Sequence, residues 1–446
     1  MARTFLIGAC ATGLVVLSAA AAQAGTGGEH PPPGVVSASP ARTTPHLPAS
    51  STPTQQIRQL VQCGGTMYAV GTFSSIQQGG KTYARTDIFS FQASSPYTVT
   101  SWAPAVVGST QTDEIGDAAV NSIAFSGGNC AVAYVGGNFS KINGTSVADI
   151  AEISTSTGNV VTGFAHAANG GVDTLAAVRG HLLAGGSFTA INGAAIAHLA
   201  SLSPVTGKND GFVKLAVTGG KVYNQQLSHG GTLDLIEGTF SAAGGLARHQ
   251  IFMLNVGGST ASVTGWTSPD FSAACTQSFW AHGAAWSPDD STVYVATNGY
   301  HVVGGSTHGP RSGPCDAALA YPATQTSVAH RWINYTGCDS LYSAAADGKG
   351  AYFGGHERYS MNPQACNTLG TGAYNAPGME GLDPANGALY INAGGSAGYY
   401  SRARGLGADD MLVTSAGLWI ASDNLDGSST CGGVSGLAGI CFLPYG

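Results

Sequence analysis

The sequence predicts an all-β fold, a single β-propeller of about seven four-stranded blades, from three observations. First, three segments repeat one pattern: Tyr134–Gly144 (YVGGNFSKING), Leu183–Gly193 (LAGGSFTAING) and Ile236–Gly245 (IEGTFSAAGG). Second, the phenylalanines of this motif are separated by 66, 49 and 52 residues, at Phe73, Phe139, Phe188 and Phe240. Third, the apolar runs are short, alternating and bounded by Gly, Asn and Ser, which is typical of strands and turns. Glycine-ended repeats of about 40–50 residues are the signature of propeller blades.

Each repeat contains the elements of one blade in the same order. It opens with a short alternating strand, as at Ile57–Val61, Ala119–Phe125 and Val172–Ala177. The glycine-rich motif forms the second strand, and a third strand follows at residues 87–91, 148–153, 197–202 and 250–254. The fourth strand carries one aromatic residue per repeat, which we expect to pack between blades. These aromatic residues are Trp102, Phe164, Phe212, Trp266 and Trp332. First strands start near residues 56, 119, 171, 221, 279, 341 and 408, which gives about seven blades.

The two ends of the chain are predicted to close the ring. The last segment, Asp409–Tyr445, contains signals for three strands and lacks a fourth. Residues 38–49 precede the first blade and resemble the missing piece, so we predict that this N-terminal strand completes the last blade and covers an open sheet edge. The propeller then spans residues 38–446. Residues 25–37 are rich in glycine and proline and are predicted to be disordered.

Residues 1–24 have the three parts of a secretory signal peptide. Arg3 supplies the positive region, Phe5–Leu17 the apolar region, and Ala22-Gln23-Ala24 the cleavage site. No other stretch approaches the roughly 18 apolar residues of a membrane span. Charged residues make up 9% of the chain and the net charge is −7, which excludes attraction to nucleic acid or to an anionic membrane. The sequence therefore predicts a secreted, extracellular protein.

The cysteines predict disulfides. Eight of the nine cysteines follow the signal peptide, and an even number without any CxxC motif favours disulfides over a metal or redox site. Cys63 and Cys130 are a plausible pair because both precede the glycine-rich strand of neighbouring blades. Proximity in the chain suggests Cys275–Cys315, Cys338–Cys366 and Cys431–Cys441 for the others, with buried free thiols as the alternative.

The glycine-rich motif has the form GG-[NS]-F-[ST]-x-ING in its clearest copies. Turns similar to xDxxTG follow the third strands, at Ser154–Gly158, Ser203–Gly207 and Leu382–Gly387. With these features the chain, over roughly residues 38–446, resembles the delta-sixty repeat β-propellers, which are secreted bacterial proteins. The resemblance is specific in the second and third blades and eroded in the fifth to seventh. It implies a fold and an exported location, but no settled reaction and no catalytic residue, and propellers host many unrelated functions.

Two predicted loops depart most from the repeat, and loops on a rigid scaffold are where binding residues concentrate. The loop at residues 301–315 in blade five carries His301, His308 and Arg311. The loop at residues 356–377 in blade six carries His356, Glu357, Arg358 and Tyr359. We interpret this face as a binding surface for an extracellular glycan, a cell-envelope component or a protein, on a monomer that needs no cofactor.

The same loops allow an enzymatic interpretation, and the sequence does not decide between the two. In an extracellular hydrolase or lyase, Glu357 or His356 would act as general acid/base, and Arg358 or Arg311 would hold an anionic group. The loops also fit a purely structural role, as a stapled cap with solvated charges. A metal site formed by the loop histidines is disfavoured because no metal-ligand spacing is present.

Two further acidic positions lie where a side chain could face the central channel. Glu237 is in a glycine-rich strand, where a solvated or hydrogen-bonded strand residue is the favoured interpretation. Asp409 and Asp410 open the last blade, where an acidic turn is favoured and a contact with the channel is the alternative.

Overall fold

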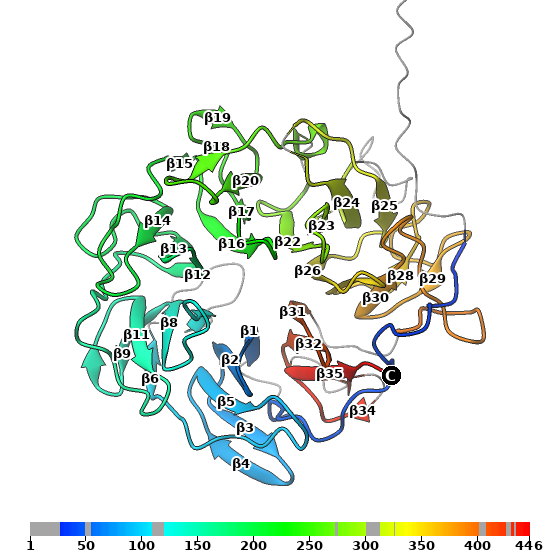
Figure 1. Cartoon of the computed structure of the whole chain (residues 1–446). Helices are drawn as coiled ribbons and strands as arrows, with labels where there is room; N and C mark the ends of the chain where they lie inside the picture. Colours follow the sequence, from blue (N-terminus) through cyan, green and yellow to red (C-terminus); the bar gives the residue numbers. More distant parts are fainter. Residues whose placement is uncertain are drawn as a thin grey trace, which may run out of the picture.

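The computed structural model describes residues 27–49, 55–108, 120–272, 275–299, 313–324, 326–400, 407–424, 430–431 and 434–446. The signal peptide predicted at residues 1–24 lies outside these ranges. Antiparallel sheets follow one another around a ring, and in each sheet the chain runs from the centre of the ring outward (Figure 1).

Each sheet repeats the same three strands. The innermost strands in the described residues are β1 (Gln56–Cys63), β7 (Val120–Ala124), β12 (Val172–Val178), β16 (Val222–Leu227), β22 (Ala281–Trp286), β26 (Leu341–Ala346) and β31 (Ala408–Thr414). Their partners, in the same order, are β2 (Thr66–Thr72), β8 (Val132–Gly137), β13 (His181–Gly186), β17 (Leu233–Gly238), β23 (Thr292–Thr297), β27 (Ala351–Gly355) and β32 (Gly417–Ser422). The third strands are β5 (Ile88–Gln92), β11 (Ile150–Ser154), β14 (Leu199–Leu202), β20 (Ile251–Asn255), β24 (Ala317–Pro322), β30 (Met379–Leu382) and β35 (Ile440–Pro444).

Consecutive innermost strands contact one another, from β1 through β7, β12, β16, β22 and β26 to β31, and β31 contacts β1 again. This closed cycle of radial sheets confirms the predicted all-β propeller. The described residues contain one short 3₁₀ helix, η1 (Pro269–Ser272), and no helix long and apolar enough to cross a membrane.

The fourth strand is less regular than predicted. It forms a strand in two sheets, as β21 (Ser262–Val263) and β25 (Trp332–Tyr335). In four others the described residues at this position make one isolated pair with the third strand, for example Val99 with Phe91 and Val160 with Ile153. The segment leaves the sheet after this pair, a few residues before its aromatic side chain enters the space between sheets.

Short hairpins and bridging strands decorate the outer part of the ring. They are β3 (Ser75–Gln78) with β4 (Lys81–Ala84), β6 (Val106–Gly108) with β9 (Phe139–Ile142) and β10 (Thr145–Ser146), β15 (Val217–Thr218) with β18 (Ala242–Ala243) and β19 (Leu246–Ala247), β28 (Tyr359–Ser360) with β29 (Tyr374–Asn375), and β33 (Thr430–Cys431) with β34 (Val434–Ser435).

The repeated aromatic residues pack between sheets, as predicted. Trp102, Phe164, Phe212, Trp266 and Trp332 are all buried. The indole Nε1 of Trp102 donates to the carbonyl of Ser154 at 3.1 Å, and that of Trp332 donates to the carbonyl of Pro384 at 3.0 Å. Each indole therefore links its own sheet to the next one around the ring, which satisfies its polar atom inside the core.

The repeated glycine has a steric cause. A Cβ on Gly71, Gly186 or Gly238 would collide with a backbone carbonyl oxygen just before, or at the start of, the innermost strand. Only glycine permits so close an approach of two backbones. The glycine-rich motif therefore marks where the backbone of the second strand approaches that of the first most closely.

The N-terminal segment closes the ring along β35 (Figure 1). The backbone N–H groups of Ser37, Ala41 and Leu47 donate to the carbonyls of Pro444, Phe442 and Ala438 at 2.7, 2.9 and 2.8 Å. The last sheet thus receives its outer edge from the start of the chain, as predicted, although through isolated pairs rather than a regular strand.

Residues 27–37 differ from the predicted disorder, while residues 25 and 26 lie outside the described ranges. Glu29 forms a parallel bridge with Tyr390, donating its N–H to Leu389 and accepting from the N–H of Ile391. A composition rich in glycine and proline does not reveal that a free sheet edge is available, and this edge orders the segment.

All four predicted disulfides are present: Cys63–Cys130, Cys275–Cys315, Cys338–Cys366 and Cys431–Cys441.

Every innermost strand carries a β-bulge at the same position. The pairing register shifts by one residue between Ile57 and Gln59 in β1, and the same shift recurs in β7, β12, β16, β22, β26 and β31. A bulge leaves one extra residue unpaired and redirects its side chain. The bulged residues, here called the bulge ring, are Arg58, Asn121, Asp173, Tyr223, His282, Tyr342 and Asp409.

Candidate binding site at the centre of the ring

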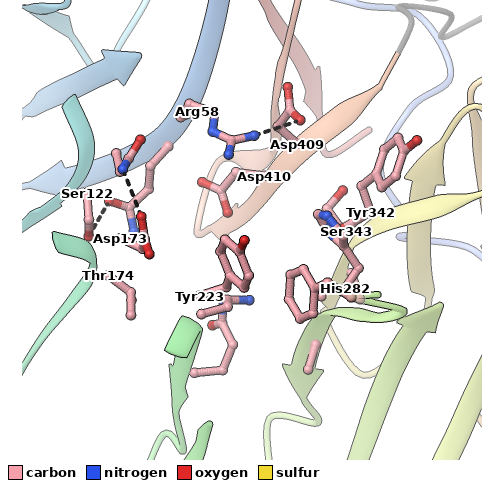
Figure 2. A pocket seen from close by; sticks show the side chains of 18 of the residues that line it. Arg58, Ser122, Asp173, Thr174, Tyr223, His282, Tyr342, Ser343, Asp409 and Asp410 are labelled. Carbon is pink, nitrogen blue, oxygen red and sulfur yellow. Dashed lines mark hydrogen bonds and ion pairs between the residues drawn. The ribbon is translucent and has the colours of Figure 1, made fainter. Parts of the chain in front are cut away.

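The whole bulge ring lines one cavity of about 100 Å³ at the centre of the propeller (Figure 2). A second cavity, of about 330 Å³, shares Arg58, Tyr223, Phe279, His282, Tyr342 and Asp409 with the first. Its remaining lining comes from positions just before the innermost strands or just after the second strands, so it lies nearer the surface. We call the two the inner and the outer cavity.

One side of the outer cavity is an arc of aromatic rings from three consecutive sheets. The rings of Tyr223 and Phe279 stack with centroids 4.5 Å apart and an interplanar angle of 18°. Phe279 is followed by His282 at 4.7 Å, His282 by Tyr342 at 4.9 Å, and Tyr342 by His356 at 4.9 Å. We call these five residues the aromatic arc, and they provide a continuous apolar wall with polar edges.

The opposite side of the inner cavity is charged. Arg58 Nη1 lies 3.5 Å from Asp409 Oδ1, and Gln56 Nε2 donates to Asp409 Oδ2 at 2.5 Å. Further round the ring, Lys221 Nζ lies 3.6 Å from Asp173 Oδ2. Arg58 and Lys221 are thus each paired with a carboxylate of the bulge ring.

Asp410 follows the bulge in β31 and also lines the inner cavity. Its Oδ2 accepts a hydrogen bond from the backbone N–H of Leu60 at 2.9 Å. No ion pair involves it within the described part of the chain. Figure 2 shows Asp410 between Arg58 and the ring of Tyr223.

Burial changes the ionisation of the site. It raises the pKa of Asp409 to about 7, an effect that Arg58 opposes and Asp423 reinforces, and it raises the pKa of Asp410 to about 6. Burial lowers the pKa of His282 to about 4, and its Nδ1 donates to the carbonyl of Tyr342 at 3.2 Å. His282 is therefore neutral at pH 7, whereas both aspartates titrate near neutrality.

Asn298 brings a hydrogen-bond acceptor that the protein leaves unused. Its side chain lines the outer cavity and the residue is only 7% exposed, yet its Oδ1 has no hydrogen-bond partner among the residues that the structure describes. Buried polar atoms nearly always have a partner, so such an atom calls for an explanation. A donor from a bound molecule would provide one.

Of the predicted site residues, the structure brings one to the cavities. His301, His308 and Arg311 lie outside the described residues. His356 is exposed, lines the outer cavity, and its Nδ1 lies 3.1 Å from the hydroxyl of Tyr342.

The other predicted residues of blade six do not line either cavity. Glu357 is 1% exposed, and burial together with the nearby Glu380 carboxylate raises its pKa well above the usual range. Arg358 pairs with Asp339, with an Nη2–Oδ1 distance of 2.6 Å, and lies 5.3 Å from the ring of Tyr359. The acid/base role of Glu357 and His356 and the binding role of Arg358 and Tyr359 stay predictions.

The structure decides between the interpretations of the acidic residues Glu237, Asp409 and Asp410. Glu237 is fully buried and its Oε2 accepts from Asn224 Nδ2 at 3.0 Å, which confirms the hydrogen-bonded interpretation. Asp409 and Asp410 belong to β31 and line the inner cavity, so the contact with the channel is correct and the acidic turn is wrong.

Sequence reasoning missed the bulge ring as a set. The ring residue lies one to three positions after each predicted strand start, but its identity varies from Arg to Asp to Tyr. What repeats is the buried apolar residue before it: Ile57, Val120, Val172, Val222, Ala281, Leu341 and Ala408. The position directly after this buried apolar residue in each first strand is therefore the sequence feature that could have identified the bulge ring.

No protein-family model matches the chain, and no curated protein matches it. Among solved structures, it is similar to the WD40 β-propeller domain of Doa1, with 12% sequence identity and a TM-score of 0.44, over 85% of this chain and 94% of that one.

Proposed function

We propose that this protein is a secreted binding protein that holds an extracellular glycan at the centre of the propeller, on the face where the innermost strands begin. The observation that carries the proposal is the aromatic arc, which faces carboxylate and amide side chains across one cavity. Ligand sites typically combine an apolar, largely aromatic wall with a few placed polar groups, in cavities of about 300–1,000 Å³. A sugar ring offers an apolar face and a rim of hydroxyl groups, which matches both sides.

Export is supported by the signal-peptide pattern of residues 1–24 and by four disulfides, which persist in oxidising compartments. The resemblance to the delta-sixty repeat propellers supports the same location and rests on the glycine-rich motif. We expect a monomer, because ring closure leaves few open sheet edges for another copy to pair with.

The experiment is a thermal-stability screen of the mature protein with neutral, acidic and basic oligosaccharides. A ligand at 100 times its Kd adds about 2.7 kcal/mol to the free energy of unfolding, which raises the melting temperature. The Tyr223→Ala variant removes one ring of the aromatic arc and should weaken a bound glycan about tenfold, since such ring contacts contribute about 1 kcal/mol or more.

Tyr83→Ala is the matched control. Tyr83 lies on the outer hairpin and, like Tyr223, is partly buried with a lysine over its ring. Lys81 Nζ lies 4.8 Å from the ring centroid of Tyr83, and Lys221 Nζ lies 4.0 Å from the ring centroid of Tyr223. Binding that is equally weakened in both variants, or absent across the whole panel, would refute the proposed site. Turnover of a bound glycan would instead favour the extracellular hydrolase or lyase.

A further inference from the structure

The charges around the inner cavity are not balanced. Asp173, Asp409 and Asp410 contribute carboxylates to its lining, and Arg58 contributes the only basic side chain of that lining among the described residues. Arg58 is paired with Asp409, and Lys221, from outside the lining, with Asp173. Asp410 is the carboxylate left for a ligand.

The aromatic side of the site also favours positive charge. Aromatic faces attract ammonium groups, and Lys221 Nζ already lies 4.0 Å above the ring of Tyr223. The neighbouring His282 donates from Nδ1 to the carbonyl of Tyr342 and is a neutral ring at pH 7, so it does not repel a cation.

We propose that the bound glycan carries free amino groups, as in a deacetylated hexosamine oligomer, with one ammonium group against Asp410 and its sugar ring against the aromatic arc. This inference rests on the proposed function. An ammonium group has three donors, which suit the carboxylate of Asp410, and its charge suits the neighbouring rings of the aromatic arc other than Tyr223, whose faces are covered by Lys221 and Phe279.

The unused acceptor in the outer cavity points the same way. Asn298 Oδ1 is buried without a donor, so a ligand rich in N–H and O–H groups would satisfy it. An anionic glycan would present hydrogen-bond acceptors to a site whose own available groups are also hydrogen-bond acceptors, so the two would not pair. Its carboxylate or sulfate would meet Asp410, while Arg58 is already engaged by Asp409.

The test compares two ligands on the unchanged mature protein by isothermal titration calorimetry, at about pH 6.5. The probes are the β-1,4-linked glucosamine tetrasaccharide and its fully N-acetylated form. We expect the free amine to bind at least tenfold more tightly. Equal affinities, or tighter binding of the acetylated form, would overturn the inference and leave the proposed glycan site standing. Binding of neither would overturn the inference and count against the proposed function.

The Asp410→Asn variant assigns the preference to one residue. Asparagine keeps an oxygen for the N–H of Leu60 and removes the charge, so we expect the preference for the amine over the acetylated form to fall to near unity. Asp383→Asn removes the same charge from a turn that follows β30, where Asp383 Oδ1 accepts from the N–H of Ala385 at 2.6 Å, and should keep the full preference. A preference that survives in Asp410→Asn, or that Asp383→Asn also abolishes, would refute the role of Asp410.

Discussion

Glu237 gives the sharpest test of the electrostatics of this propeller. The residue is fully buried in β17, and burial raises the pKa of its carboxyl to about 8, which the hydrogen bond from Asn224 only partly offsets. The folded protein therefore keeps a proton on Glu237 that the unfolded chain loses near pH 4.5. Stability from this group is complete below that pH and is lost as the pH rises through about 8.

The magnitude follows from the two pKa values. One pH unit inside this window changes the free energy of unfolding by at most about 1.4 kcal/mol, so between pH 5 and pH 7 Glu237 should remove about 2–3 kcal/mol. Glutamine does not titrate. The Glu237→Gln variant should therefore gain about 2–3 kcal/mol on the wild type between pH 5 and pH 7, whatever constant offset the amide introduces.

Guanidinium unfolding followed by tryptophan fluorescence, with the disulfides intact, measures this difference. Other titrating groups are common to both proteins and cancel. Asp289→Asn is the control, because hydrogen bonds from Ser287 and Ser291 lower the pKa of this exposed carboxyl to about 2, so it does not titrate between pH 5 and pH 7. If Glu237→Gln and the wild type keep the same stability difference at both pH values, the carboxyl is not protonated in the folded protein and the reasoning is wrong.

Three further predictions concern the scaffold. Trp266→Ala should lower the free energy of unfolding by about 3–5 kcal/mol in a denaturant titration, because this fully buried indole fills the space between two sheets; a loss below about 1 kcal/mol would contradict the packing. Removing the Cys63–Cys130 disulfide by double substitution to serine should reduce stability by about 4 kcal/mol, from the 67-residue separation it spans, and an unchanged melting temperature would show that the link constrains little. Gly186→Ala, whose Cβ would strike the carbonyl of Gly171, should destabilise more than Gly163→Ala, whose Cβ meets nothing within 4 Å and whose backbone is not left-handed, and the opposite ranking by thermal melting would refute the steric account of the motif.

The sequence predicts the scaffold better than the site because the two depend on different features. Close backbone approach requires glycine in several sheets, as at Gly71, Gly186 and Gly238, and buried aromatic side chains fill the spaces between sheets, so both recur in the sequence. The bulge ring imposes a position without imposing a residue type, as Arg58 and Tyr223 show, and leaves no motif.

The sequence also could not predict which residues at the ends of the loops are buried and which are exposed. His356 and Glu357 are adjacent in the chain, yet one is exposed at the outer cavity and the other is buried beside Glu380. Which of two neighbouring residues faces solvent depends on where the chain turns after β27. That turn is fixed by contacts with residues some twenty positions later, such as the N–H of Gly378, which donates to the carbonyl of Glu357 at 2.8 Å.

The bulge separates the residues of the proposed binding site from those that keep the protein folded. Each ring residue stands outside the regular pairing of its strand, directly after a buried apolar residue that anchors it. A substitution there alters the chemistry of the cavity while the core beside it stays intact. Under the proposed function, single changes at the seven positions of the bulge ring would alter ligand specificity without altering the fold, and a designer could change the specificity of the scaffold by the same route.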